Sequence, residues 1–398
     1  MTTIAEPDIN PGLNSISLPA LFLKFLRFGC LAFGGPVAQI AMIRQALVEE
    51  ERWISPARFN RLLAIMQILP GPEAHELCVH MGMTARGRIG GLLAGLGFML
   101  PGLLLMLLAG WAYRDWIAGA SGWTSALFGI QLVVLAIIAR AVQRIGGHVL
   151  EDRQAWLLAI GSFAATLLGA PFWIPLIAAG LLREMRARRG VVVLILMVSL
   201  ALGVLLHRSH GLHVASPQGE GVGLLLLFIA GLKGGLLTFG GAYTAIPYVR
   251  ADTVGRGWLS DATFLDGVAF AGILPAPLVI FATFAGYVAG GLPGALVITV
   301  GMFLPAFAFS MIFFERLESV VENPALHNIL AGVAAAVVGV IAATLVELAS
   351  ATFARSSSLV VALSILVLAL VGAWRIKGKW AAPLLLTLGG VAGWLLRP

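Results

Sequence analysis

The sequence predicts an all-α polytopic membrane protein made of two homologous halves, and three observations support that prediction. Hydrophobic residues make up 59% of the 398 residues and charged residues only 11%, whereas a soluble domain carries about 25% charged residues. Apolar runs of membrane length recur along the chain. The second half also repeats motifs of the first half in the same order. A chain with so little charge is expected to face lipid rather than water.

Thirteen apolar segments are candidate membrane spans. Five have clear membrane length: 88–112, 122–142, 190–206, 290–314 and 326–348. The others are weaker or interrupted: 17–40, 57–83, 154–170, 171–183, 221–247, 262–287, 358–373 and 380–396. A full crossing needs about 20 residues, so the shorter segments are expected to be tilted, broken or half-helices. Whether 57–83 and 262–287 cross fully or are re-entrant stays open from the sequence.

The basic residues predict how the chain is oriented. The net charge of +7 comes from clusters that lie between apolar segments, so nucleic acid is not an expected partner. The positive-inside rule places three clusters in the cytoplasm: Arg140, Arg144 and Arg153; Arg183, Arg186, Arg188 and Arg189; and Arg375, Lys377 and Lys379. This orientation predicts an inside N-terminus and an outside C-terminus. The loop 44–61 carries four arginines on the side that this count places outside, so its side stays open.

The internal repeat is the most informative feature of the sequence. The matched elements are Phe33-Gly34-Gly35 with Phe239-Gly240-Gly241, Arg44 with Arg250, Pro70 and Pro72 with Pro275 and Pro277, and Pro101 with Pro305. We therefore divide the chain into a first copy at 1–183, a linker with one span at 184–220, and a second copy at 221–398. Six spans plus the linker span bring the second copy in from the opposite side of the membrane. Such inverted repeats are typical of secondary transporters.

Each copy is expected to contain a broken helix within the membrane. Pro70-Gly71-Pro72 and Pro275-Ala276-Pro277 interrupt apolar sequence, and two prolines so close together stop a helix. Phe-Gly-Gly is expected to form a second break in each copy. A helix that restarts after Pro72 or Pro277 directs free N–H groups into the break, which suits a small dianion. The alternative is that these prolines only kink the helices for packing.

Ionisable residues inside spans are functional candidates. Lys233 lies deep in apolar sequence and is a candidate for binding an anion. Glu73, His75 and Glu76 follow the first proline break directly and are candidates for proton uptake during transport. The alternative for these three side chains is ordinary hydrogen bonding at a water-exposed helix start.

Other polar residues near the breaks could donate hydrogen bonds to an oxyanion. Arg44 and Arg250 follow the two Phe-Gly-Gly motifs at the same offset, and an arginine offers a planar fork of donors. The alternative for both is a role as membrane-interface anchors. Gln39, Gln67 and Tyr243 are further candidate donors, although polar residues also join packed membrane helices.

The motifs FGGP (33–36), QILPGP (67–72), FGG (239–241) and ILPAP (273–277) resemble those of the chromate ion transporter family in its long, two-domain form. The resemblance extends over nearly the whole chain. It implies a multi-pass protein of the bacterial inner membrane that exports chromate and confers chromate resistance. It also implies sulfate as a competing dianion and coupling to the proton gradient. The chain departs from the family pattern at Ala276, and at the polar run that follows Pro72.

Other function classes are less well supported by the sequence. An anion channel, or a transporter of another small anion, stays an alternative. A membrane enzyme is not expected, because no HExxH, GxSxG or paired-aspartate motif lies in a span, and no phosphate-binding P-loop occurs. Cys30 and Cys78 have no metal-binding spacing, so neither a metal nor a cofactor is expected. A homodimer stays open.

Overall fold

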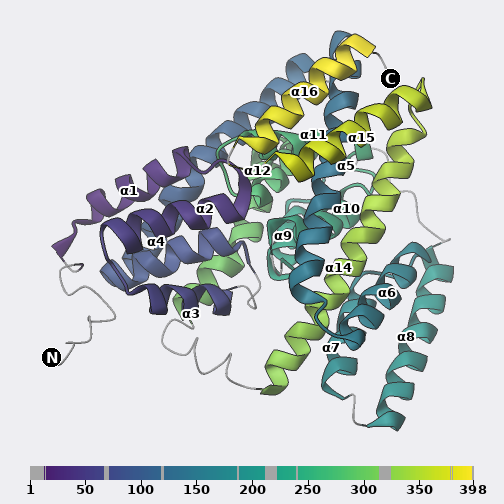
Figure 1. Ribbon diagram of the computed structural model, residues 1–398, viewed down its shortest axis with the longest axis horizontal. Helices are drawn as coiled ribbons and strands as arrows, with labels where there is room; N and C mark the ends of the chain where they lie inside the picture. Colours follow the sequence, from purple (N-terminus) through teal and green to yellow (C-terminus); the bar gives the residue numbers. More distant parts are fainter. Residues whose placement is uncertain are drawn as a thin grey trace.

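The computed structural model describes residues 13, 15–66, 71–117, 121–185, 188–210, 222–238, 241–312, 324–376, 378 and 380–396. Every element with defined bounds in these residues is a helix (Figure 1). The first half contains α1 (Leu18–Cys30), α2 (Gly35–Arg44), the π-helix η2 (Gln45–Glu50), α3 (Pro56–Met66), α4 (Glu73–Ala112), η3 (Tyr113–Ile117), α5 (Ser121–Val149), α6 (Arg153–Leu167) and α7 (Trp173–Glu184).

The helix α8 (Arg189–His210) leads to the second half. That half contains α9 (Leu224–Leu236), η4 (Ala242–Ala245), α10 (Ile246–Thr253), α11 (Asp261–Ile273), η5 (Leu278–Ile280), α12 (Phe281–Ile312), α14 (Pro324–Phe353), α15 (Leu359–Arg375) and α16 (Ala381–Leu396).

The helical membrane class predicted from composition is confirmed. Within the described ranges, four helices are long and apolar enough to cross a bilayer: Glu73–Ile117, Trp123–Val149, Leu278–Ile312 and Asn328–Phe353. The same ranges contain four shorter apolar helices, Gly190–Gly203, Leu224–Leu236, Leu359–Arg375 and Ala381–Leu396. The total of thirteen segments stays a prediction.

The longest helix of each half contains a sharp kink at the corresponding place. In α4 the backbone leaves helical geometry at Arg86 (φ −142°, ψ 30°) and Gly87 (φ 60°, ψ −154°). In α12 it does so at Gly290 (φ −137°, ψ 18°) and Gly291 (φ 64°, ψ −158°). The second residue of each pair has positive φ, which glycine adopts without steric cost. The two halves therefore use the same backbone geometry at the boundary between neighbouring apolar segments.

Close helix contacts also recur between the halves. A Cβ atom at Gly97 would collide with the carbonyl oxygen of Phe22, where α4 crosses α1. A Cβ atom at Gly301 would collide with the carbonyl oxygen of Phe228, where α12 crosses α9. Small residues allow two membrane helices to approach this closely. The repeated sequence motifs thus correspond to repeated packing.

The two halves interlock along their long helices. The first-half helix α5 packs on α15 and α16, whereas the second-half helix α14 packs on α6 and α7. Figure 1 shows α5 and α14 between these two helical pairs, with α15 and α16 in the upper part of the view and α6 and α7 in the lower part. Gly129 of α5 meets the backbone of Gly389, and Gly332 of α14 meets the backbone of Ala179. Each half is therefore completed by helices of the other half.

Candidate anion site

A cavity of about 430 Å³ lies where both halves contribute backbone breaks and polar side chains. Its lining includes Gly34 and Gly35 at the start of α2, Arg140 and Arg144 on α5, and Tyr243 in η4. Residues at the start of α16 and the preceding Gly378 also line it. Because α5 carries both arginines, its position between the halves brings two positive charges to the cavity.

The two arginines leave the cavity with uncompensated positive charge. Arg140 makes one hydrogen bond, from Nη1 to the carbonyl oxygen of Ile376 at 3.4 Å. Arg144 makes no hydrogen bond or ion pair within the part of the chain that the structure describes. Its charge acts on the Glu73 carboxyl group, and both arginines act on the Tyr243 phenol. Two guanidinium groups with free donors suit an oxyanion.

The start of α2 adds backbone donors to this cavity. Gly34 (φ 85°) is the N-cap of α2, and Gly35 (φ 77°) is its first residue. Both conformations are left-handed, so glycine at these positions allows the chain to turn sharply into the helix. No side chain caps this helix, and the first N–H groups of a helix have no partner within it. The first Phe-Gly-Gly break thus forms one wall of the cavity.

The start of α4 has a different arrangement from the one expected of an anion site. Pro72 is the N-cap, so the helix restarts directly after the Pro-Gly-Pro motif, as the sequence suggested. The Glu76 side chain folds back and takes the space beside Gly71, where an added Cβ would collide with Oε1. The helix start is therefore filled by the protein's own carboxyl group.

Three ionisable side chains are buried at this helix start. Glu73, His75 and Glu76 are 7%, 0% and 1% exposed. Neither ring nitrogen of His75 and neither carboxyl oxygen of Glu76 has a hydrogen-bond partner among the described residues. The His75 ring packs against Phe303 and Phe307, with centroid distances of 4.9 and 4.8 Å. Burial of unsatisfied polar groups is costly, and such groups in a membrane span are candidates for a functional role.

The broken segments of the two halves touch each other directly. The Gly71 N–H donates to the carbonyl oxygen of Thr238, just before the second Phe-Gly-Gly motif, at 2.8 Å. Gln39 donates from Nε2 to the carbonyl oxygen of Ala276, between Pro275 and Pro277, at 2.8 Å. The same Nε2 also donates to the carbonyl oxygen of Ala32 in the first half. The Gln39 side chain therefore links the two halves. Irregular backbone at membrane depth is tolerated when protein groups satisfy it in this way.

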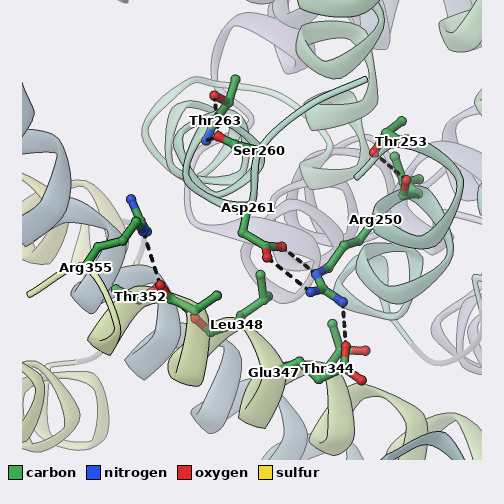
Figure 2. Close-up of polar contacts among 12 residues, drawn as sticks. Arg250, Thr253, Ser260, Asp261, Thr263, Thr344, Glu347, Leu348, Thr352 and Arg355 are labelled. Carbon is green, nitrogen blue, oxygen red and sulfur yellow. Dashed lines mark hydrogen bonds and ion pairs between the residues drawn. The ribbon is translucent and has the colours of Figure 1, made fainter. Parts of the chain in front are cut away.

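The second half places its basic candidates in ion pairs. Figure 2 shows Arg250 between Asp261 and Glu347, with Nε–Oδ1 and Nη1–Oε2 distances of 2.7 and 2.5 Å. Lys233 pairs with Asp252 at 3.0 Å. Neither Arg250 nor Lys233 lines the cavity. Both side chains thus have carboxylate partners of their own.

Only some of the remaining candidates from the sequence lie near the cavity. Phe33 packs on Trp380, with a centroid distance of 5.1 Å. Gly241 (φ 134°) lies beside Ile145, next to Arg144 in the chain. Arg44 is exposed and pairs with Glu49 at 3.4 Å. Four candidates, Gln67, Pro70, Phe239 and Gly240, lie outside the described residues.

In the sequence, Arg140 and Arg144 stand out only as orientation signals. They stand one helical turn apart at the end of an apolar segment, so they project from the same face of α5. That spacing within a membrane helix was the signal that could have identified them. No group of three or more His, Cys, Asp or Glu residues that could hold a metal occurs in the described ranges.

The comparison with known proteins agrees with the resemblance noted in the motifs. A family model described as chromate transporter matches residues 19–183 and 225–394. A chromate transport protein of Pseudomonas aeruginosa is 53% identical over 96% of this chain and 93% of that protein. A chromate transport protein of Cupriavidus metallidurans is 31% identical over 84% of this chain and 83% of its own.

More distant relatives extend the same pattern. A probable chromate transport protein of Synechococcus elongatus is 29% identical over 95% of both chains. No solved structure matches the chain. The match of the family model over most of the chain, together with the Pseudomonas relative, shows that this protein belongs to the chromate transporter family.

Proposed function

We propose that this protein is a secondary active transporter that exports chromate across the bacterial inner membrane and thereby confers chromate resistance. The observation that carries the proposal is the cavity whose two arginines, Arg140 and Arg144, have no carboxylate partner among the described residues. Chromate transport by the relatives supports the cargo. Sulfate, a dianion of similar chemistry, is expected to compete.

In this proposal the dianion binds between α5 and the start of α2. Arg140 and Arg144 donate charge-assisted hydrogen bonds, and the N–H groups in the first turn of α2 add the positive end of the helix dipole. Gly34 and Gly35 allow the anion to approach the backbone, because they carry no side chain. Arg250 and Lys233 hold the second half together through their ion pairs.

The export direction follows from the charge of the cargo and the position of the cavity. Arg140, Arg144 and Arg375 belong to clusters that the positive-inside rule assigns to the cytoplasm. A cavity on that side would load anions from the cytoplasm. An inside-negative potential favours the exit of a dianion by about 4.6 kcal/mol per 100 mV, twice the value for one charge.

We further propose that Glu73 and Glu76 couple proton binding to anion binding. The positive charge of Arg144, which would bind the anion, also reaches the Glu73 carboxyl group through its electric field, without an ion pair between the two side chains. An ionised Glu73 repels a dianion and competes for Arg144, so binding of the dianion should favour the protonated form. His75, two residues after Glu73 and fully buried, is a candidate to pass the proton on.

Alternating access in this proposal uses the two copies, 1–183 and 221–398, as an inverted repeat. The matched kinks at Gly87 and Gly291, and the exchange of partners between α5 and α14, support an arrangement in which each copy can adopt the other's conformation. Transporters built from inverted repeats change access by movement of one repeat against the other.

The test is chromate uptake into everted membrane vesicles that contain the protein. Potential and pH gradient are imposed separately, and sulfate is added as a competitor. Saturable uptake above empty vesicles, inhibited by sulfate and driven by a lumen-positive potential, is the expected result. Folded, inserted protein without any chromate uptake would reject chromate as the cargo. Uptake that does not saturate would instead favour an anion channel.

A further inference from the structure

A second cavity lies away from the anion site, between α6, α7 and α8. Its volume is about 570 Å³, and its lining is almost entirely apolar. Leu157 and Gly161 of α6 and Leu168 directly after it line one side, Leu182 of α7 another, and Leu200 of α8 a third. The helix α8 packs chiefly on α7. This leaves an apolar groove between membrane helices, which we call the α6–α8 groove.

The length of the α6–α8 groove matches one leaflet of a bilayer. From Leu157 to Leu168 an α-helix rises roughly 16 Å, at about 1.5 Å per residue. One leaflet contributes about half of a hydrocarbon core that is about 30 Å thick. An extended acyl chain therefore fits along the groove, and the lining residues are of the kind that such a chain contacts.

One end of the groove carries two arginines, next to the carboxylates of Glu151 and Asp152. Arg153 lies one turn before Leu157 on α6, and Arg183 directly follows Leu182 on α7. Arg183 is paired with Asp152 at 2.8 Å. Arg153 is exposed and makes no hydrogen bond or ion pair in the described part of the chain. The free guanidinium group is thus available to a negatively charged group at the mouth of the groove.

We propose that the α6–α8 groove binds one acyl chain of an anionic phospholipid from the surrounding bilayer, with the headgroup phosphate on Arg153. Charge complementarity selects the lipid, because basic pockets between membrane helices on the cytoplasmic side bind anionic headgroups. The other basic residue with a described side chain near this end, Arg188, is exposed as well. This site is separate from the anion cavity and does not depend on what the protein transports.

Native mass spectrometry of the purified full-length protein tests the proposal. Phosphatidylglycerol and phosphatidylcholine with identical acyl chains are added at equal concentration. We expect phosphatidylglycerol to be retained preferentially, and Arg153→Gln to weaken its binding about fivefold, the effect of one basic residue at an anionic headgroup. Equal retention of the two lipids by the unmodified protein would overturn the proposal.

A second variant tests the groove itself. A Cβ at Gly161 has no atom within 4 Å, so Gly161→Leu can fill the groove without a clash and should reduce phosphatidylglycerol retention. Gly147→Leu is the matched control, because Gly147 is exposed on α5 and also has free space around its Cβ. If Gly161→Leu fails to fold, Gly203→Leu fills the opposite wall. Retention equal to that of Gly147→Leu in a folded groove variant would contradict the proposal.

Discussion

The two halves of this protein have similar helices, kinks and packing, yet they differ in whether their charged side chains are paired. Glu347 lies fifteen residues after Gly332 on α14, as Arg144 lies fifteen residues after Gly129 on α5. At this equivalent position the second half has a carboxylate tied to Arg250. The first half has an arginine facing a cavity. A repeated fold can therefore hold a neutralised ion pair in one copy and leave a charge for a ligand in the other.

The polar groups that join the second half to α5 reinforce this contrast. Asp266 of α11 accepts hydrogen bonds from Tyr113 at 2.9 Å and from Gln131 at 2.8 Å. Gln131 in turn accepts one from Arg355 at 3.0 Å. Satisfied buried networks of this kind make a packed region rigid. In the first half, by contrast, His75 and Glu76 are buried without hydrogen-bond partners in the described residues.

The largest effect is expected at Arg144. Arg144→Gln removes a charged donor to the anion, and a hydrogen bond to a charged group contributes roughly 1.5–3 kcal/mol. Loss of that energy should reduce chromate uptake into vesicles roughly 10- to 100-fold. Arg88→Gln, an exposed arginine near the α4 kink, is the matched control and should transport normally. Unchanged uptake by Arg144→Gln would show that Arg144 does not bind the anion.

The next prediction concerns Arg250, whose loss should reduce the stability of the protein but not its uptake of chromate. Arg250→Gln leaves Asp261 and Glu347 without their cation. Loss of one partner in a fully buried pair costs about 3–5 kcal/mol, and partial exposure of these groups reduces that to roughly 1–3 kcal/mol. Thermal unfolding in detergent should show this loss. Uptake per folded molecule should stay close to that of the unmodified protein, because Arg250 does not line the anion cavity.

The equivalent change in the first copy is the control for Arg250. Arg44 is exposed and has one ion pair at 3.4 Å, and exposed pairs contribute about 0–1 kcal/mol. Arg44→Gln should therefore barely change the unfolding temperature. A variant of Arg250 that folds normally but abolishes chromate uptake would show that the second copy also binds the anion.

A smaller effect is expected from Glu73→Gln, which keeps the side chain neutral. Because the proposed coupling requires Glu73 to exchange a proton as Arg144 binds the anion, uptake should continue but respond less to an imposed pH gradient. Vesicle uptake at fixed potential, with and without the gradient, measures this response. Glu151→Gln, at an exposed position, is the control. An unaltered response to the gradient would show that Glu73 is not the coupling group.

The smallest effect tests whether the two kinks are equivalent. Gly87 and Gly291 have φ values of 60° and 64°, with no atom closer than 3.9 Å to an added Cβ. Alanine at either position should cost roughly 1–2 kcal/mol, because this combination of φ and ψ is accessible essentially to glycine alone. Thermal unfolding of Gly87→Ala and Gly291→Ala should therefore show similar losses, and Gly147→Ala in a regular helix should show none. Clearly unequal losses would mean that the two kinks do not contribute equally to stability.

Several features of this protein were determined by the sequence alone. Low charge and long apolar runs require helices in a bilayer, because only internal hydrogen bonds can satisfy the backbone there. Pro72 is the N-cap of α4, which begins at Glu73, since proline lacks an N–H donor and is tolerated at a helix start but not in its interior. These effects act within a few residues, so they can be predicted without knowing the partners of each helix.

The anion cavity was decided by the tertiary structure. Arg140 and Arg144 appear in the sequence as an ordinary basic cluster, and only the position of α5 between the two halves brings them to Gly34 and Tyr243. The same packing gives Arg250 two carboxylates from α11 and α14, while Arg44 stays at the surface. Whether a charge is paired or free depends on groups far apart in the chain, and local sequence patterns contain no information about those distances.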